Sequence, residues 1–99
     1  MSKGKGMYID MEAEEYDYIM TFTSHHRAMY MYERLIARKI KVKLVNAPNK
    51  INISCTQAIK FRGADIEIVQ KELERNNIIQ TATFKIIKEG KNETYELVE

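Results

Sequence analysis

The sequence contains few of the residues that cross-link small proteins or form redox and metal sites. Its 99 residues include one cysteine, one proline, four glycines and no tryptophan. A single cysteine excludes an internal disulfide, a Cys-x-x-Cys redox pair and a multi-cysteine zinc site within one chain. No stretch approaches the roughly 20 apolar residues of a transmembrane helix, and the N-terminus lacks the apolar centre of a signal peptide. We therefore expect a cytoplasmic protein without a membrane segment.

Charge of one sign is not in excess either. Sixteen Lys and Arg residues against 14 Asp and Glu give a net charge of +2 and a pI near 8.6, below the strongly basic range of nucleic-acid-binding domains. The apolar share of 44% and the charged share of 30% are typical of a globular chain. We expect an N-terminal extension over residues 1–15, with a short strand at 7–11, and one domain over residues 16–99, which is long enough for a single core.

Hydrophobic periodicity predicts alternating strands and helices. Strands are expected at 16–22, 41–45, 55–61, 81–88 and 93–98. Helices are expected from 25 or 26 to 40 and from about 66 to 76 or 77, the second capped by Asp65. The predicted core-facing residues of the first helix are Ala28, Met29, Tyr32, Leu35, Ile36 and Ile40. Those of the second helix are Ile66, Val69 and Leu73, whereas Glu72 is expected to face water.

The order β-α-β-β-α-β predicts an α+β, ferredoxin-like two-layer sandwich, in which an antiparallel sheet carries both helices on one face. A C-terminal hairpin adds a last strand. Right-handed crossovers leave room for one strand between the first and second strands, and the third strand is the natural occupant, antiparallel to the first. The start of the third strand should then lie beside the end of the first.

This pairing brings Cys55 to the turn that precedes the first helix. Thr23 and Ser24 offer caps for that helix. His25 and His26 follow them directly. A helix N-terminus stabilises a nearby thiolate, and either histidine could add a positive charge or relay a proton. Cys55 is therefore the candidate reactive residue, supported by these four residues. The opposing interpretation is that Cys55 fills the top of the core and that the histidines are simply solvated.

A metal site is not expected from the same residues. One cysteine and two histidines supply at most three zinc ligands, and no fourth ligand is evident in the sequence. We predict no metal and no cofactor.

Three blocks of the sequence resemble a known family: FTSHHRA at 22–28, LVNAP at 44–48 and SCTQAIK at 54–60. They are similar to the blocks of small bacterial and archaeal domains described as selenium or sulfur carrier proteins. Three positions depart from the family pattern, because Thr56 stands where Gly is usual after the cysteine, Asn46 replaces the first Pro, and Asn49 replaces an Arg.

The resemblance implies a carrier rather than an enzyme. Cys55 would accept a sulfane sulfur or selenium atom from a donor such as a cysteine desulfurase and pass it to an acceptor protein that the sequence does not identify. The residues that would contact the transferred atom are Ser54, Thr56 and Lys60.

RNA binding is a second hypothesis, because ferredoxin-like sheets also serve RNA-recognition domains. The residues that could form a basic patch are Lys39, Lys41, Lys43, Lys60 and Arg62. However, the third strand lacks the paired aromatic residues that stack bases in such domains. Nucleic acid is therefore not the expected partner.

A third hypothesis is a dimerising or regulatory module in which Cys55 is structural. Tyr30 and Met31 fall outside the predicted apolar stripe, and exposed Tyr and Met are common at subunit interfaces. The second face of the sheet is also uncovered in a simple two-layer fold. We expect a homodimer.

Overall fold

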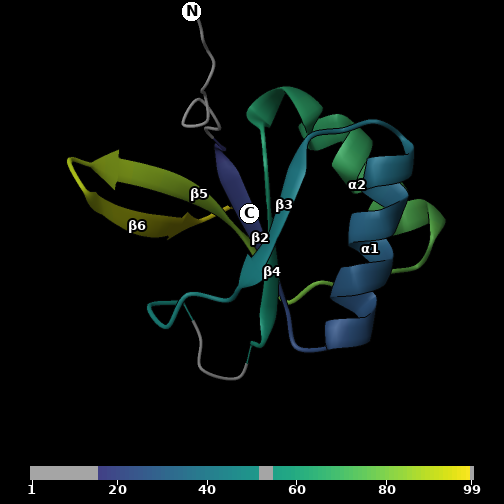
Figure 1. Ribbon diagram of the computed structural model, residues 1–99, viewed down its shortest axis with the longest axis horizontal. Coiled ribbons are helices and arrows are strands. Elements are labelled where there is room, and N and C mark those ends of the chain that lie inside the picture. Colours follow the sequence, from purple (N-terminus) through teal and green to yellow (C-terminus); the bar gives the residue numbers. More distant parts are fainter. Residues whose placement is uncertain (1–15, 52–54, 99) are drawn as a thin grey trace, which may run out of the picture.

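The computed structural model describes residues 16–51 and 55–98 of the chain. Within them, five antiparallel strands form one sheet, and two helices pack on it (Figure 1). The predicted α+β class is confirmed. The expected strand at 7–11, like the whole extension 1–15, lies outside the described residues.

The elements follow the predicted order; most bounds differ by no more than two residues, and the end of α1 differs by three. The strands are β2 (Tyr18–Phe22), β3 (Val42–Asn46), β4 (Gln57–Phe61), β5 (Ala82–Glu89) and β6 (Asn92–Leu97). The helical elements are α1 (His25–Ala37), the 3₁₀ turn η2 (Gly63–Asp65) and α2 (Ile66–Arg75).

The strand β4 lies between β2 and β3, as the crossover argument predicts. The sheet order is β3-β4-β2-β5-β6, and β4 pairs antiparallel with both of its neighbours. Its first residue, Gln57, is opposite Phe22 of β2 and Asn46 of β3. The start of β4 therefore lies beside the end of β2, where the chain turns into α1.

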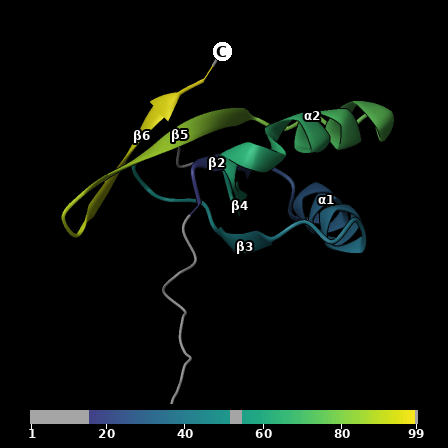
Figure 2. The same cartoon turned by 90° about the horizontal axis from the view of Figure 1, so that it is seen from above.

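Both helices cover the same face of the sheet (Figure 2). The core on that face joins Met20, Phe22, Ile59 and Phe61 from the sheet to residues of both helices. The side chains that α1 buries are those of Ala28, Met31 and Leu35. The predicted stripe is therefore wrong at two positions.

Met31 was expected outside the stripe and is fully buried, whereas Ile36 was expected inside it and is 46% exposed. Successive helix residues are rotated by about 100°. Burial of Leu35 against the sheet therefore turns the next residue, Ile36, toward solvent.

Both helices end in the same hydrogen-bonded motif. After α1, Lys39 adopts a positive φ of 65°, and Ile40 donates its N–H to the carbonyl of Leu35. After α2, Asn77 has a φ of 53°, and Ile78 donates to the carbonyl of Leu73. This Schellman arrangement satisfies the last carbonyl groups of each helix and returns a buried isoleucine to the core. The predicted continuation of α1 through Ile40 is therefore wrong, although its burial is confirmed.

The predicted cap of the second helix is also different in detail. Asp65 occupies the N-cap position of α2, but its side chain makes no capping hydrogen bond. Its carboxylate lies 3.4 Å from Nε of Arg62 instead. The tight turn η2 precedes α2 and holds Asp65 in a conformation (φ −102°, ψ 7°) unlike the extended backbone of an ordinary cap.

Glu72 is the main exception to the predicted polar face of α2, since its side chain is buried rather than solvated. Oε2 of Glu72 lies 2.9 Å from Nη1 of Arg38 and 3.7 Å from Nη1 of Arg75. Oε1 accepts a hydrogen bond of 2.9 Å from Asn76 Nδ2 and lies 3.5 Å from Nε of Arg34. One buried carboxylate thus links α1 to the end of α2.

The second face of the sheet is partly covered by the chain itself. Its core consists of Tyr16, Ile19, Ala58 and Ile86. Residues from β3, from the loop after it and from the hairpin β5–β6 pack against this core, namely Val45, Ala47, Ile51, Phe84 and Tyr95. The hairpin extends beyond β2, because only the first four residues of β5, 82–85, pair with β2.

We predict that Glu72→Gln lowers the free energy of unfolding by about 2 kcal/mol, because charge-assisted hydrogen bonds contribute about 1.5–3 kcal/mol each. The variant keeps the shape of the side chain and removes its charge from the two helices. Urea denaturation measures the change. Glu74→Gln, an exposed position on the same helix, is the matched control, and equal losses in both variants would contradict a structural role for the buried carboxylate.

Candidate functional site

Cys55 is a free cysteine that lies two residues before β4 and is 7% exposed. The residue after it continues the pairing of β4 with its neighbours. The N–H of Thr56 donates to the carbonyl of Phe22 over 3.1 Å, and the N–H of Ala47 donates to the carbonyl of Thr56 over 3.3 Å. Cys55 therefore precedes a backbone segment that is held on both sides, next to the end of β2.

The turn from β2 into α1 is shaped by Ser24. Its Oγ accepts a hydrogen bond of 3.2 Å from the N–H of Arg27, and its backbone is extended, so that it is the N-cap of α1. The helix starts at His25, one of the two starts, His25 and His26, that the sequence predicts. The first turn of α1 contains no acidic residue, so no side-chain charge of that turn offsets the positive end of the helix dipole.

A side-chain contact ties this turn to β4. The hydroxyl of Thr56 donates to the carbonyl of Thr23 over 3.4 Å. Thr23 thus enters the site through its backbone carbonyl, and Thr56 fixes the position of the chain next to Cys55.

Gln57 is the residue that the sequence analysis missed. Its Nε2 donates to the carbonyl of Val45 in β3 over 3.0 Å, so its Oε1 is the atom that faces His25. Nδ1 of His25 lies 3.1 Å from this oxygen. Because an amide oxygen only accepts, Nδ1 of His25 carries the proton and Nε2 of the neutral ring keeps its lone pair. Gln57 shares the strand parity of Cys55, which is the signal that could have pointed to it.

The two histidines separate in space. The ring centroids of His25 and His26 are 6.2 Å apart at an interplanar angle of 65°. His26 lines a cavity of about 260 Å³ with Arg27, Tyr30 and residues 76–78. Tyr30 donates its hydroxyl to Oδ1 of Asn76 over 3.1 Å on the same side. His25, and not His26, is thus bonded to the strand that follows Cys55.

Lys60 stands apart from this group. Lys60 lies near the other end of β4, opposite Ile19, and forms an ion pair of 3.5 Å with Glu93. Ser54 lies outside the described residues. Of the residues that the sequence predicted for the site, the structure brings Thr23, His25 and Thr56 into direct contact with one another or with Gln57, but not Lys60.

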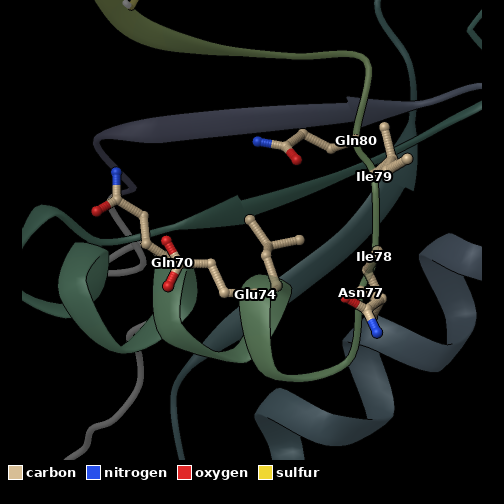
Figure 3. A pocket seen from close by; sticks show the side chains of 7 residues that line it. Gln70, Glu74, Asn77, Ile78, Ile79 and Gln80 are labelled. Atoms are coloured by element: carbon tan, nitrogen blue, oxygen red, sulfur yellow. The ribbon is translucent and has the colours of Figure 1, made fainter.

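A wider groove lies on another side of the protein. It has a volume of about 700 Å³ and is bounded by α2 and by the segment that leads to β5 (Figure 3). Its lining residues are Gln70, Leu73, Glu74 and residues 77–80. Ile79 at its edge is 74% exposed. The groove brings no nucleophilic or metal-ligating cluster together.

The described residues contain neither a metal-ligating cluster nor a helix that could span a membrane. Across residues 16–51 and 55–98, no three His, Cys, Asp or Glu side chains gather as they would around a metal ion. In the same residues, no helix is both long enough and apolar enough to cross a lipid bilayer.

Residues 17–85 match the profile of a protein family described as "Putative Se/S carrier protein-like". The match spans most of the chain, from the start of the sheet through both helices and into β5. It includes Cys55, Gln57 and His25. No curated protein and no solved structure matches the chain.

We predict that neutral His25 carries its proton on Nδ1. The ¹⁵N chemical shifts of the imidazole ring distinguish the two tautomers, and His26, which lacks the Gln57 contact, serves as the internal control. Gln57→Leu removes the acceptor and should abolish the Nδ1 preference of His25 without changing His26. If His25 and His26 show the same tautomer mixture in the wild-type protein, the bridge to Gln57 does not persist in solution.

Proposed function

Because this chain belongs to the Se/S carrier protein-like family, we propose that Cys55 accepts a sulfane sulfur or selenium atom from a donor protein and passes it on. The observation that supports this most is the bonded junction between the segment after Cys55 and the start of α1. Two side-chain contacts make up this junction, Thr56 to Thr23 and Gln57 to His25.

The transfer is an exchange at sulfur. The Cys55 thiolate attacks the terminal sulfur of a cysteine persulfide on the donor, a new S–S bond forms at Cys55, and the S–S bond of the donor breaks. The electron pair of the broken bond stays on the donor cysteine as a thiolate, so the transferred sulfur keeps its oxidation state and no external reductant is needed. A second exchange of the same kind delivers the atom to the acceptor. A selenium atom follows the same path as a selenopersulfide.

The start of α1 suits the anions of this exchange. The first N–H groups of a helix lie outside its own hydrogen-bond ladder and favour negative charge. They would stabilise the Cys55 thiolate and the persulfide anion that replaces it. In the proposal, His25 exchanges a proton through Nε2, because Nδ1 is engaged by Gln57. Ser24 holds the helix start in place.

We extend the proposal to the fold type, the donor protein and the cellular compartment. We assign the part from β2 to β5 to the ferredoxin-like arrangement, with β6 added at the edge; the position of β4 between β2 and β3 supports this. The donor we propose is a cysteine desulfurase, whose product is a cysteine persulfide. The cytoplasm is the proposed compartment, because a lone thiol stays reduced there.

We predict that a cysteine desulfurase given ³⁵S-cysteine loads one labelled sulfur atom on the wild-type chain. Cys55→Ser should carry none, because it removes the only thiol. Intact-protein mass spectrometry without reductant measures the product.

A relocated thiol controls for general reactivity. The double variant Cys55→Ser with Thr94→Cys carries its thiol on the exposed strand β6 instead. A carrier site requires faster loading of the wild type than of this variant, although the relocated thiol is more accessible. Equal or faster loading of the relocated thiol would contradict the proposal.

The second candidate is a dimerising module in which Cys55 is structural. Exposed apolar side chains support it, since Ile79 is 74% and Leu97 is 58% exposed. The structural role of Cys55 in this candidate is supported by its burial, because Cys55 is only 7% exposed. Met31, however, is buried within the chain and is not available to a partner.

The alkylation of Cys55 separates the two candidates. A carrier requires the thiol of the folded protein to react with iodoacetamide at neutral pH, because a donor protein must reach Cys55 without unfolding the chain. Ser24→Ala, which weakens the helix cap, should slow this reaction at constant pH. A thiol that reacts only after unfolding would reject the carrier and favour the module.

A further inference from the structure

A small polar cavity lies on the sheet face opposite the helices. It measures about 110 Å³. Its lining residues are Tyr16, Lys43, Lys60, Ile86, Lys88 and Glu93. The three lysines come from three different strands, β3, β4 and β5, and all project to the face that carries the core of Ile19, Ala58 and Ile86.

The hairpin β5–β6 closes this cavity from one side. Glu93 is on β6, yet its Oε1 lies 3.5 Å from Nζ of Lys60 on β4, although two strands, β2 and β5, lie between β4 and β6 in the sheet. The backbone carbonyl of Glu93 also accepts a hydrogen bond of 3.0 Å from Nζ of Lys50 in the loop after β3. The hairpin therefore curves over the open face of the sheet and meets the lysines there.

The lysines repel one another, and the negative charges of the described residues offset this repulsion only in part. Lys43 and Lys60 are directly opposite each other on adjacent strands, and like charges in this position destabilise a sheet. Glu93 supplies the single negative charge of the lining, so that the cavity keeps a net charge of +2. Lys43 forms no salt bridge in the described part of the chain. Lys88 is opposite Glu93 on the adjacent strand and its charge helps to lower the pKa of Glu93, but it forms no salt bridge in these residues either.

Glu93 is held in its ionised state by its own neighbours. Burial of its carboxyl group raises the pKa, but the hydrogen bond of 3.0 Å from the Tyr95 hydroxyl and the charge of Lys60 outweigh this, so the pKa of Glu93 is lowered. Burial and the bond to Glu93 raise the pKa of Tyr95 to about 12, which keeps its hydroxyl protonated as the donor. Glu93 therefore orients Lys60 in the cavity at neutral pH.

We propose that this lysine cavity binds a small tetrahedral oxyanion, phosphate or sulfate, either free or as the end group of a larger molecule. Three ammonium groups from three strands supply donors for the oxygens of such an ion, and a divalent anion neutralises the net charge of the lining. The volume of about 110 Å³ is far below the roughly 300–1,000 Å³ of pockets that enclose a whole drug-sized ligand. Only the oxyanion itself would be enclosed.

The oxyanion site is separate from Cys55. Lys60 is in β4, five residues after Cys55, which precedes the strand. At about 3.3 Å per residue, the two residues are roughly 16 Å apart along the strand direction. The inference therefore goes beyond the proposed carrier function, and neither depends on the other.

Titration calorimetry with sodium phosphate and with sodium sulfate, against sodium chloride at equal ionic strength, tests the proposal on the full chain. We expect saturable binding of phosphate or sulfate and none of chloride. Lys43→Gln and Lys88→Gln should each weaken it about tenfold, the effect of one lost charge-assisted hydrogen bond. Both side chains are exposed and belong to neither hydrophobic core, so the variants should fold.

Lys85→Gln is the matched control, because Lys85 is an exposed lysine of the same strand as Lys88 with the opposite parity. It should leave phosphate binding unchanged. Equal weakening in Lys85→Gln and Lys88→Gln would indicate general charge attraction and overturn the proposal, as would the absence of saturable binding. A phosphomonoester such as glycerol phosphate distinguishes the source: tighter binding than phosphate identifies an end group, and weaker binding a free ion.

Discussion

The pairing of β4 between β2 and β3 is the constraint on which the rest of the structure depends. The pair Phe22–Gln57 joins the end of β2 to the start of β4, and this brings the segment after Cys55 to the first turn of α1. Further along the same strand, the pair Lys43–Lys60 sets two like charges side by side. One register therefore determines both the candidate carrier site and the candidate oxyanion site, at opposite ends and on opposite faces of β4.

Much of the fold could be predicted from the sequence, because its determinants are local. Alternating apolar residues marked the strands, Ser24 marked the start of α1, and the handedness of crossovers left a single place for β4. The burial of individual side chains was harder to predict from the sequence. Met31 and Ile36 exchanged their expected exposures because the rotation of α1 is set by what it packs on, and its own periodicity leaves that choice open.

The residues that sequence reasoning missed all act between elements. Glu72 looks like any charged residue of a helix surface until Arg34 and Arg38 of the other helix face it. Gln57 looks like a filler of β4 until Val45 and His25 take up the two ends of its amide. The cavity beside Lys60 depends on the curvature of a hairpin, and strand periodicity carries no information about curvature. A single sequence reveals candidate elements more readily than the side chains that join them.

The contact between His25 and Gln57 has a consequence for how that ring can move. The bond uses the proton on Nδ1, and both the neutral Nδ1–H tautomer and the imidazolium carry a proton there. The ring can therefore gain and lose its other proton without breaking the bond or changing its rotamer. A histidine held in this way presents Nε2 in one fixed direction in both protonation states, and the strand next to it does not have to readjust between them.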